Sequence, residues 1–292
     1  MDKKKAIKIV KKDGLELRSL PINFKKDKDV VLTAVNQNGY ALQYADKILT
    51  KDKEIVLETV KADGDAIKFA DKNFTKDKGI VLLAVKQFGD ALEHADKSLI
   101  KDREIVLLAV KNYGLALKHA HENLQKNKEV VLTAVKEYGF ALKYAHQSLQ
   151  KDKEVVRAAI KQNGNCFPYA HESIKKDREI ILLALKTYGN ALEYADENLK
   201  KDKKIVLKAI KKDGGAIRFA DQSFKKDKDV VLAAVREEGI CLYHADESLK
   251  KDKEVVIAAL KKNIAALEYV HKNLKNDKDI LAIINKKKST YY

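Results

Sequence analysis

A hydrophobic pattern with a step of 25 residues runs along this 292-residue chain. In the segment that starts at Asp52, apolar residues from Ile55 to Val60 fill a wide arc of a helical wheel, and charged residues fill the rest. Asp52 suits a helix N-cap, and Gly64 follows the last periodic residue. The pattern predicts a first helix over residues 53–62 that Gly64 closes in the left-handed conformation.

A second, shorter helix is predicted from the apolar residues Ala66, Ile67 and Phe69. Pro168 takes the position of Lys68 in a later repeat, and proline is tolerated in the first helical turn. This places the N-cap of the second helix at Asn165 in that later repeat. In the repeat that starts at Asp52, the second helix should end near residue 71. The Asn/Ser position that follows should then bond turn backbone; it comprises Asn73, Ser98, Asn123, Ser148 and Ser173.

Eleven and a half such units cover the chain and leave no room for a second domain. The repeated glycines are Gly14, Gly39, Gly64, Gly89, Gly114, Gly139, Gly164, Gly189, Gly214 and Gly239. We expect a degenerate N-terminal cap over 1–26, repeats over 27–276, a capping helix over 277–285 and a mobile tail over 286–292.

The sequence of the repeat, for example from Asp102 to Gly114, resembles the tandem repeats called domain of unknown function 4116. Their length and spacing are also similar to those of the leucine-rich-repeat variant, another short helical solenoid. The resemblance implies a helical repeat fold. It implies no catalytic residues and no assigned chemistry.

We therefore predict an all-α fold, a right-handed α-solenoid of two-helix repeats. Stacking at about 9 Å per helix layer would give an elongated monomer of about 100 Å. The shorter second helices should line its concave face.

Composition narrows the class of protein further. Hydrophobic residues make up 45% of the chain, enough for a large core, and the net charge is +16. No apolar run approaches the roughly 18 residues of a membrane span, and residues 1–13 lack the apolar stretch of a signal peptide. We expect a cytoplasmic protein without a membrane segment, unless a non-classical route exports it.

Candidate chemistry is sparse, so we expect no enzyme, no cofactor and no metal. Walker A, zinc-protease and nucleophile-elbow motifs are missing from the sequence. Cys166 and Cys241 replace a small alanine and should be buried. Three histidines alternate with Tyr and Phe, which indicates core packing: His94, His119 and His244. Four others alternate with Asp, which indicates hydrogen bonds at helix ends, with metal binding as the alternative: His121, His146, His171 and His271.

Basic residues recur at one position of the first helix. They are Lys61, Lys86, Lys111, Lys136, Lys161, Lys186, Lys211, Arg236 and Lys261. Such a column could follow a phosphate backbone. However, the acidic residues Asp52 and Glu54 lie among the basic residues at the start of the first helix. No exposed aromatic platform is evident beside the column. A solvated helix face accounts for most of this charge.

The exposed position of the second helix changes from repeat to repeat, unlike the scaffold around it. Its residues are Gln43, Lys68, Glu93, Lys118, Lys143, Pro168, Glu193, Arg218, Tyr243 and Glu268. Mixed charge here favours a protein or peptide partner on the concave face. The alternatives are nonspecific nucleic-acid binding through the lysine column, or a structural spacer.

Overall fold

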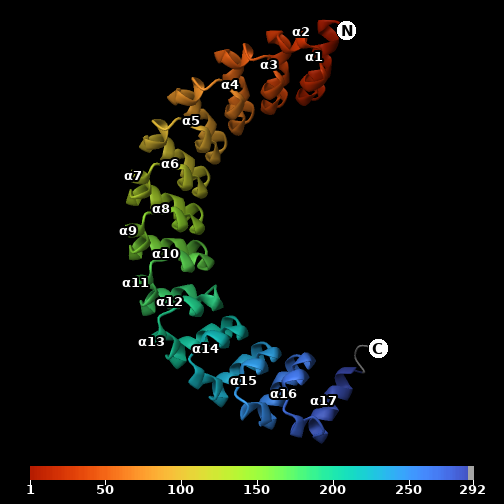
Figure 1. Cartoon of the computed structure of the whole chain (residues 1–292), viewed down its shortest axis with the longest axis vertical. Coiled ribbons are helices and arrows are strands. Elements are labelled where there is room, and N and C mark those ends of the chain that lie inside the picture. Colours follow the sequence, from red (N-terminus) through yellow and green to blue (C-terminus); the bar gives the residue numbers. More distant parts are fainter. Residues whose placement is uncertain (289–292) are drawn as a thin grey trace. The chain divides into compact units, whose positions relative to one another are not determined.

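The chain is helical throughout the range that its computed structural model describes, residues 1–288 (Figure 1). Within that range there is no strand, so the predicted all-α repeat fold is confirmed. The chain forms two compact parts, Met1–Ala158 and Ala159–Tyr292, which we describe separately. No helix in the described range has the length and apolar character needed to cross a membrane.

Each repeat contains a long α-helix, a 3-10 helix and a further short helical turn. In the first part the long helices are α1 (Lys3–Lys12), α3 (Lys28–Gln37), α4 (Lys53–Ala62), α5 (Lys78–Gln87), α6 (Arg103–Asn112), α8 (Lys128–Glu137) and α10 (Lys153–Gln162), which ends beyond this part. The 3-10 helices are η1 (Gly14–Ser19), η2 (Gly39–Tyr44), η4 (Gly64–Phe69), η6 (Gly89–His94), η8 (Gly114–His119) and η9 (Gly139–Tyr144). The short turns are α2 (Ile22–Lys25), η3 (Leu49–Lys51), η5 (Phe74–Lys76), η7 (Leu99–Lys101), α7 (Glu122–Gln125) and α9 (Gln147–Gln150).

The second part follows the same order. Its longer helices are α12 (Arg178–Ala184), α14 (Lys203–Lys212), α15 (Lys228–Glu237), α16 (Lys253–Lys262) and α17 (Lys278–Lys288). The 3-10 helices are η10 (Gly164–Tyr169), η11 (Gly189–Tyr194), η12 (Gly214–Phe219), η14 (Gly239–His244) and η16 (Ile264–Tyr269). The short turns are α11 (Glu172–Lys175), α13 (Glu197–Lys200), η13 (Gln222–Lys225), η15 (Leu249–Lys251) and η17 (Lys272–Leu274).

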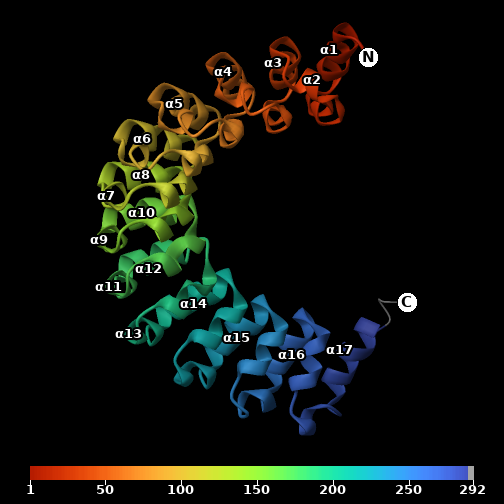
Figure 2. The ribbon, with the colours of Figure 1, turned by 45° about the horizontal axis from the view of Figure 1, so that its top comes forward.

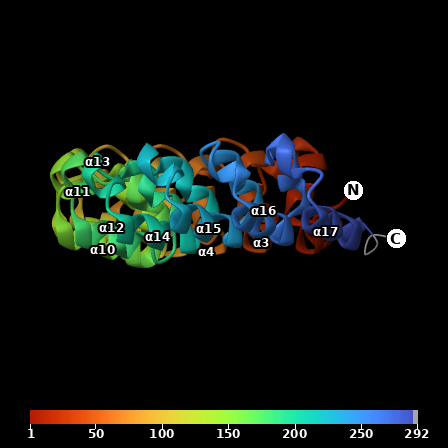
Figure 3. The ribbon, with the colours of Figure 1, turned by 90° about the horizontal axis from the view of Figure 1, so that it is seen from below.

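Like elements of neighbouring repeats pack on one another. In the first part α3 contacts α1 and α4, and η2 contacts η1 and η4. Figure 2 shows α14, α15 and α16 as successive helices of the second part. Figure 3 shows the short helices α11 and α13 in a layer apart from α12 and α14.

The predicted first helix is confirmed at both ends. Asp52 Oδ1 accepts hydrogen bonds from the backbone N–H groups of Glu54 and Ile55, at 3.0 and 3.3 Å, and so caps α4. The helix ends where Asp63 turns to an extended conformation. Ile55, Val56 and Val60 are fully buried between neighbouring repeats.

The prediction that Gly64 adopts a left-handed conformation is wrong. No residue in 1–288 has a positive φ. A side chain on Gly64 would place its Cβ 2.3 Å from the carbonyl oxygen of Ala84 in the next repeat. Glycine is therefore required here by the close approach of two backbones.

The predicted second helix is a 3-10 helix, and its N-cap lies two residues earlier than we expected. Asn163 Oδ1 accepts from Asn165 N–H at 3.0 Å, so Asn163 and not Asn165 is the cap of η10. Pro168 is the fifth residue of this element and not part of a first α-helical turn. The error arose because an α-helical period was assumed for a segment that is wound more tightly.

The third helical turn was not predicted. Where a second helix was expected to end, Asp71 Oδ1 instead accepts a hydrogen bond from Asn73 N–H at 3.0 Å, just before η5 begins. The expected bonding of Asn/Ser side chains to turn backbone is therefore replaced mainly by bonds from their backbone N–H groups. The Asp71 backbone N–H also donates to Thr50 O of the preceding repeat, at 3.0 Å.

A helix, α17, lies where the C-terminal capping helix was predicted. Ile280 and Ile284 are buried against the last repeat. The helix α17 extends to Lys288, so residues 286–288 do not belong to a tail as expected. The remaining predicted tail, 289–292, lies outside the described residues.

Candidate binding surfaces

Lysines at the start of the long helices form ion pairs between repeats. Lys28 Nζ lies 2.8 Å from both Asp52 Oδ2 and Glu54 Oε2 of the next repeat. Hydrogen bonds to these two carboxylates raise the pKa of Lys28 to about 12. The same contact recurs at Lys78, Lys128, Lys203, Lys228 and Lys253. These contacts form an ion-pair ladder in which the lysines at the helix starts are neutralised by carboxylates. The ladder was not predicted from the sequence.

The basic column predicted on the long helices is exposed at all nine of its positions. Lys61 pairs with Glu58 at 2.7 Å, and Arg236 lies 3.8 Å from Glu254. Lys86, Lys111 and Lys136, by contrast, have no ion-pair partner among the described residues. These three cations are available to a ligand.

Exposed aromatic residues, which were not expected near the basic column, follow these lysines in the sequence. Phe88, Tyr113 and Tyr138 are 45%, 36% and 39% exposed. Each follows one of the three lysines by two residues. Their exposure was not predicted because they lie at the C-cap of each long helix, after the last residue of the periodic pattern.

The variable positions of the 3-10 helices are exposed as predicted, except that Pro168 is half-buried. Some of their charges are nevertheless paired within the fold. Lys118 Nζ lies 3.3 Å from Asp90 Oδ2 of the preceding repeat. Lys68 contacts Asp65 and lies 4.8 Å from the ring centroid of Tyr40.

Asp65 is the centre of a small polar network. Although desolvation acts to raise its pKa, hydrogen bonds from Lys68, Tyr40 and His94 lower it to about 2. His94 Nε2 lies 3.0 Å from Asp65 Oδ1, with its side chain 23% exposed. His94 is therefore half-buried and hydrogen-bonded between repeats, a correction to the prediction of core packing.

Tyr243 is the one aromatic residue at the variable positions, and 60% of its surface is exposed. Its ring lies 5.2 Å from the Tyr269 ring and 5.1 Å from the His244 ring. Together with Arg218 and the 39% exposed Ile240, it borders a hollow of about 150 Å³. We call Arg218, Ile240, Tyr243 and Tyr269 the Tyr243 patch.

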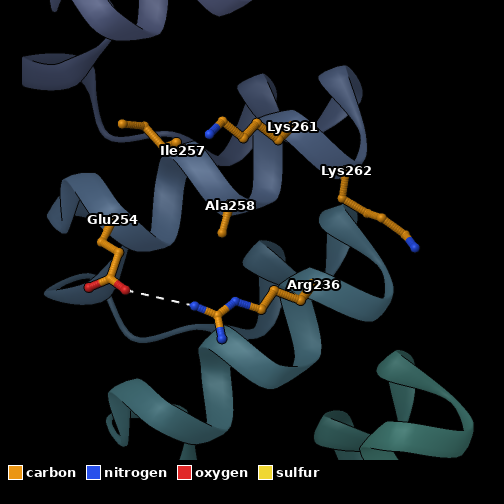
Figure 4. A pocket seen from close by; sticks show the side chains of 6 residues that line it. All are labelled: Arg236, Glu254, Ile257, Ala258, Lys261 and Lys262. Carbon is orange, nitrogen blue, oxygen red and sulfur yellow. Dashed lines mark ion pairs between the residues drawn. The ribbon is translucent and has the colours of Figure 1, made fainter.

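The long helices of the second part also leave basic hollows between them. One of about 460 Å³ has Ile257 and Ala258 beside Arg236, Lys261 and Lys262 (Figure 4). Glu254 partly offsets this charge through its pair with Arg236. Another, of about 310 Å³, is lined by Leu185, Lys186, Lys208, Lys211 and Lys212.

The His/Asp position makes hydrogen bonds at helix ends, as predicted. His146 Nδ1 accepts from the Ser148 backbone N–H at 3.2 Å, and Asp96 makes the same bond to Ser98 at 3.0 Å. Another cluster joins Asp90, Glu93 and His119, whose ligand atoms lie within 4.8 Å of one another. There the His119–Asp90 hydrogen bond and the Lys118 ammonium satisfy Asp90 without a metal ion.

Both cysteines are buried, as expected from their replacement of alanine. Burial raises the pKa of each thiol to about 12. Thiolates, not thiols, are the nucleophilic form. Neither side chain is therefore suited to nucleophilic chemistry.

A family model described as "Domain of unknown function (DUF4116)" matches overlapping pairs of these repeats. The matched residues are 2–50, 52–100, 102–150, 127–175, 152–200, 177–225, 202–250, 227–275 and 252–291. The chain belongs to the DUF4116 family. A comparison with curated proteins and one with solved structures give no match. The repeat of this family therefore specifies the scaffold, and the residues that could bind a ligand are the exposed ones.

Proposed function

We propose that this protein is a non-enzymatic scaffold that binds a protein or peptide partner through the variable positions of its 3-10 helices. The Tyr243 patch carries the proposal. Exposed Tyr and Arg side chains around a hollow are the residue types that dominate binding energy at protein interfaces. Tyr243 is held by contacts with two neighbouring rings, so it loses little conformational entropy on binding.

The scaffold beneath these positions supports this division of roles. Ala66 and Ile67 are buried, whereas the next residue, Lys68, is exposed. In the equivalent exposed positions charge changes sign from Glu93 to Lys118 without any change in the fold. These positions are thus free to differ between repeats and to match an irregular partner surface.

Binding rather than catalysis is also favoured by the buried cysteines and by the pairing of Asp90 with Lys118 and His119. We further propose that the protein acts as a monomer in the cytoplasm. Its free thiols suit a reducing compartment, and 35% charged residues suit a well-hydrated surface.

The test is affinity capture from the native host with the full chain, followed by measurement of the affinity for the captured protein. Tyr243→Ala should weaken binding at least 10-fold, or about 1.4 kcal/mol. Ile48→Ala is the matched control, because Ile48 is 73% exposed but lies outside the variable positions. A specific partner whose affinity falls equally in both variants would contradict this surface. A structural spacer would capture no specific partner.

A further inference from the structure

In three successive repeats of the first part, an exposed aromatic residue follows an exposed lysine by two positions in the sequence. Phe88, Tyr113 and Tyr138 each expose more than a third of their surface. Lys86, Lys111 and Lys136 precede them by two residues and have no ion-pair partner in the described range. We propose that this column binds single-stranded nucleic acid, with bases stacked on the rings and phosphates near the lysines.

Two of the three aromatic residues lie close to a glycine of the preceding repeat. A Cβ on Gly89 would lie 2.8 Å from Tyr113 Cβ, and one on Gly114 would lie 2.9 Å from Tyr138 Cβ. The glycine of one repeat thus lets the aromatic residue of the next approach closely. Asn112 Nδ2 also donates to the carbonyl of Lys86 at 3.0 Å, which ties that lysine's backbone to the repeat carrying Tyr113.

The charge of this surface favours a polyanion. Three lysines point to solvent, and the residues between lysine and ring are Gln87, Asn112 and Glu137. Glu137 is the one acidic residue among the nine that make up the three Lys-X-aromatic segments. The lysines of the ion-pair ladder, in contrast, are already neutralised by carboxylates.

The regular order of these groups separates nucleic acid from a peptide partner. A protein partner presents a different side chain at each contact, whereas a nucleic acid presents a base and a phosphate in every unit. Helical repeats about 9 Å apart can each take one base of an RNA strand. The strand must be single, because paired bases stack on one another and leave no face for a ring.

The column has an aromatic extension at one end. The ring of Tyr138 lies 5.5 Å from that of Phe140, tilted by 33°. A second aromatic ring thus lies next to that of Tyr138. We expect pyrimidine or purine bases to bind with little sequence preference, since every base offers a flat face.

Fluorescence anisotropy of the full chain with a labelled oligouridine of about 12 nucleotides at low salt tests the proposal. Binding should saturate in the micromolar range, and a duplex of equal length should bind at least 10-fold more weakly. The triple change Phe88→Ala, Tyr113→Ala and Tyr138→Ala should weaken binding at least 10-fold. Ultraviolet cross-linking of the unmodified protein should map to these rings, which covers the case of a variant that folds poorly.

The lysines are tested by the salt dependence of binding. Lys86→Gln, Lys111→Gln and Lys136→Gln together should reduce the log–log salt slope by about 2, at roughly 0.7 per phosphate contact on a single strand. The matched control changes the ladder lysines Lys28, Lys78 and Lys128 to Gln, with the same loss of charge. It should leave the slope unchanged.

The proposal is overturned if binding does not saturate at protein concentrations up to about 100 μM, the upper end of the micromolar range expected. It is also overturned if the duplex binds as tightly, if the ring variant binds normally, or if the control lysines matter equally. Tyr243→Ala should bind the oligonucleotide as the wild type does, so this test is independent of the protein-binding surface.

Discussion

Thr59 occupies a fully buried position where Ala34, Ala84 and Ala109 stand in other repeats. Its hydroxyl oxygen has no hydrogen-bond partner within residues 1–288. A buried unsatisfied polar group costs about 1–3 kcal/mol, and alanine fits the same site elsewhere in the chain. We predict that Thr59→Ala stabilises the protein by about 1 kcal/mol, measured by urea unfolding. Ala109→Thr, the reverse change, should destabilise it.

Two glycines differ in what a methyl group would meet. On Gly114 the new Cβ would lie 2.5 Å from Ala134 O, whereas on Gly215 the closest atom is Asp213 Oδ1 at 3.2 Å. Gly114→Ala should therefore cost about 1–3 kcal/mol through overpacking. Gly215→Ala should be neutral or slightly stabilising, because it lowers the entropy of the unfolded chain. Equal shifts in melting temperature would contradict the close backbone approach.

The network around Asp65 makes stability depend on pH. The pKa of Asp65 is about 2 in the folded chain, against an ordinary value of 3.8. The carboxylate therefore stabilises the fold above about pH 4 and loses this effect as the pH falls toward 2. We expect Asp65→Asn to destabilise the protein by about 2 kcal/mol at pH 7, from 1.36 kcal/mol per pKa unit. In urea titrations the gap between the two proteins should close between pH 4 and 2; a constant gap would contradict an ionic role.

At the scale of the elements, Asp102 both caps α6 and joins the ion-pair ladder. Its Oδ1 accepts from Glu104 N–H at 2.9 Å, and its Oδ2 lies 2.8 Å from Lys78 Nζ. Asp102→Ala should cost about 1–2 kcal/mol, mostly through the lost cap. Lys78→Ala should cost much less than Asp102→Ala, because the pair is exposed. High salt should diminish the second effect and leave most of the first, as thermal unfolding can show.

The long helices were predictable because Asp52 and the apolar positions Ile55 and Val60 mark both the start and the buried face of α4. The third turn was not, because four residues such as those of α7 are too few to show a period. The ladder also escaped notice, since Lys28 and Asp52 become neighbours only through the stacking of repeats. Exposure of Tyr113 depends on the same stacking.

At the scale of the whole molecule, the repeat predicts which deletions the chain tolerates. Side-chain bonds such as Lys78–Asp102 and His94–Asp65 join residues 24 and 29 positions apart, so contacts run between neighbouring repeats. Deleting residues 102–126 joins equivalent positions and should leave a helical, cooperatively unfolding protein. Its urea m-value should fall by roughly one-twelfth, in proportion to the surface buried.

Deleting residues 102–114 is the control, because it removes half a repeat and breaks the register. This variant should lose helical signal in circular dichroism or unfold at a much lower urea concentration. If both deletions were equally harmful, contacts between nearest neighbours would not be sufficient to maintain the fold.

The bond from Asp71 N–H to Thr50 O and the pair between Lys28 and Asp52 each join a repeat to the one before it. During synthesis each repeat can order against the one that precedes it in the chain. A chain leaving the ribosome can therefore add one finished layer at a time, and no early segment has to wait for a distant later one to fold. The length of apolar surface exposed at any moment during synthesis is then close to that of one open repeat, however many repeats the gene encodes.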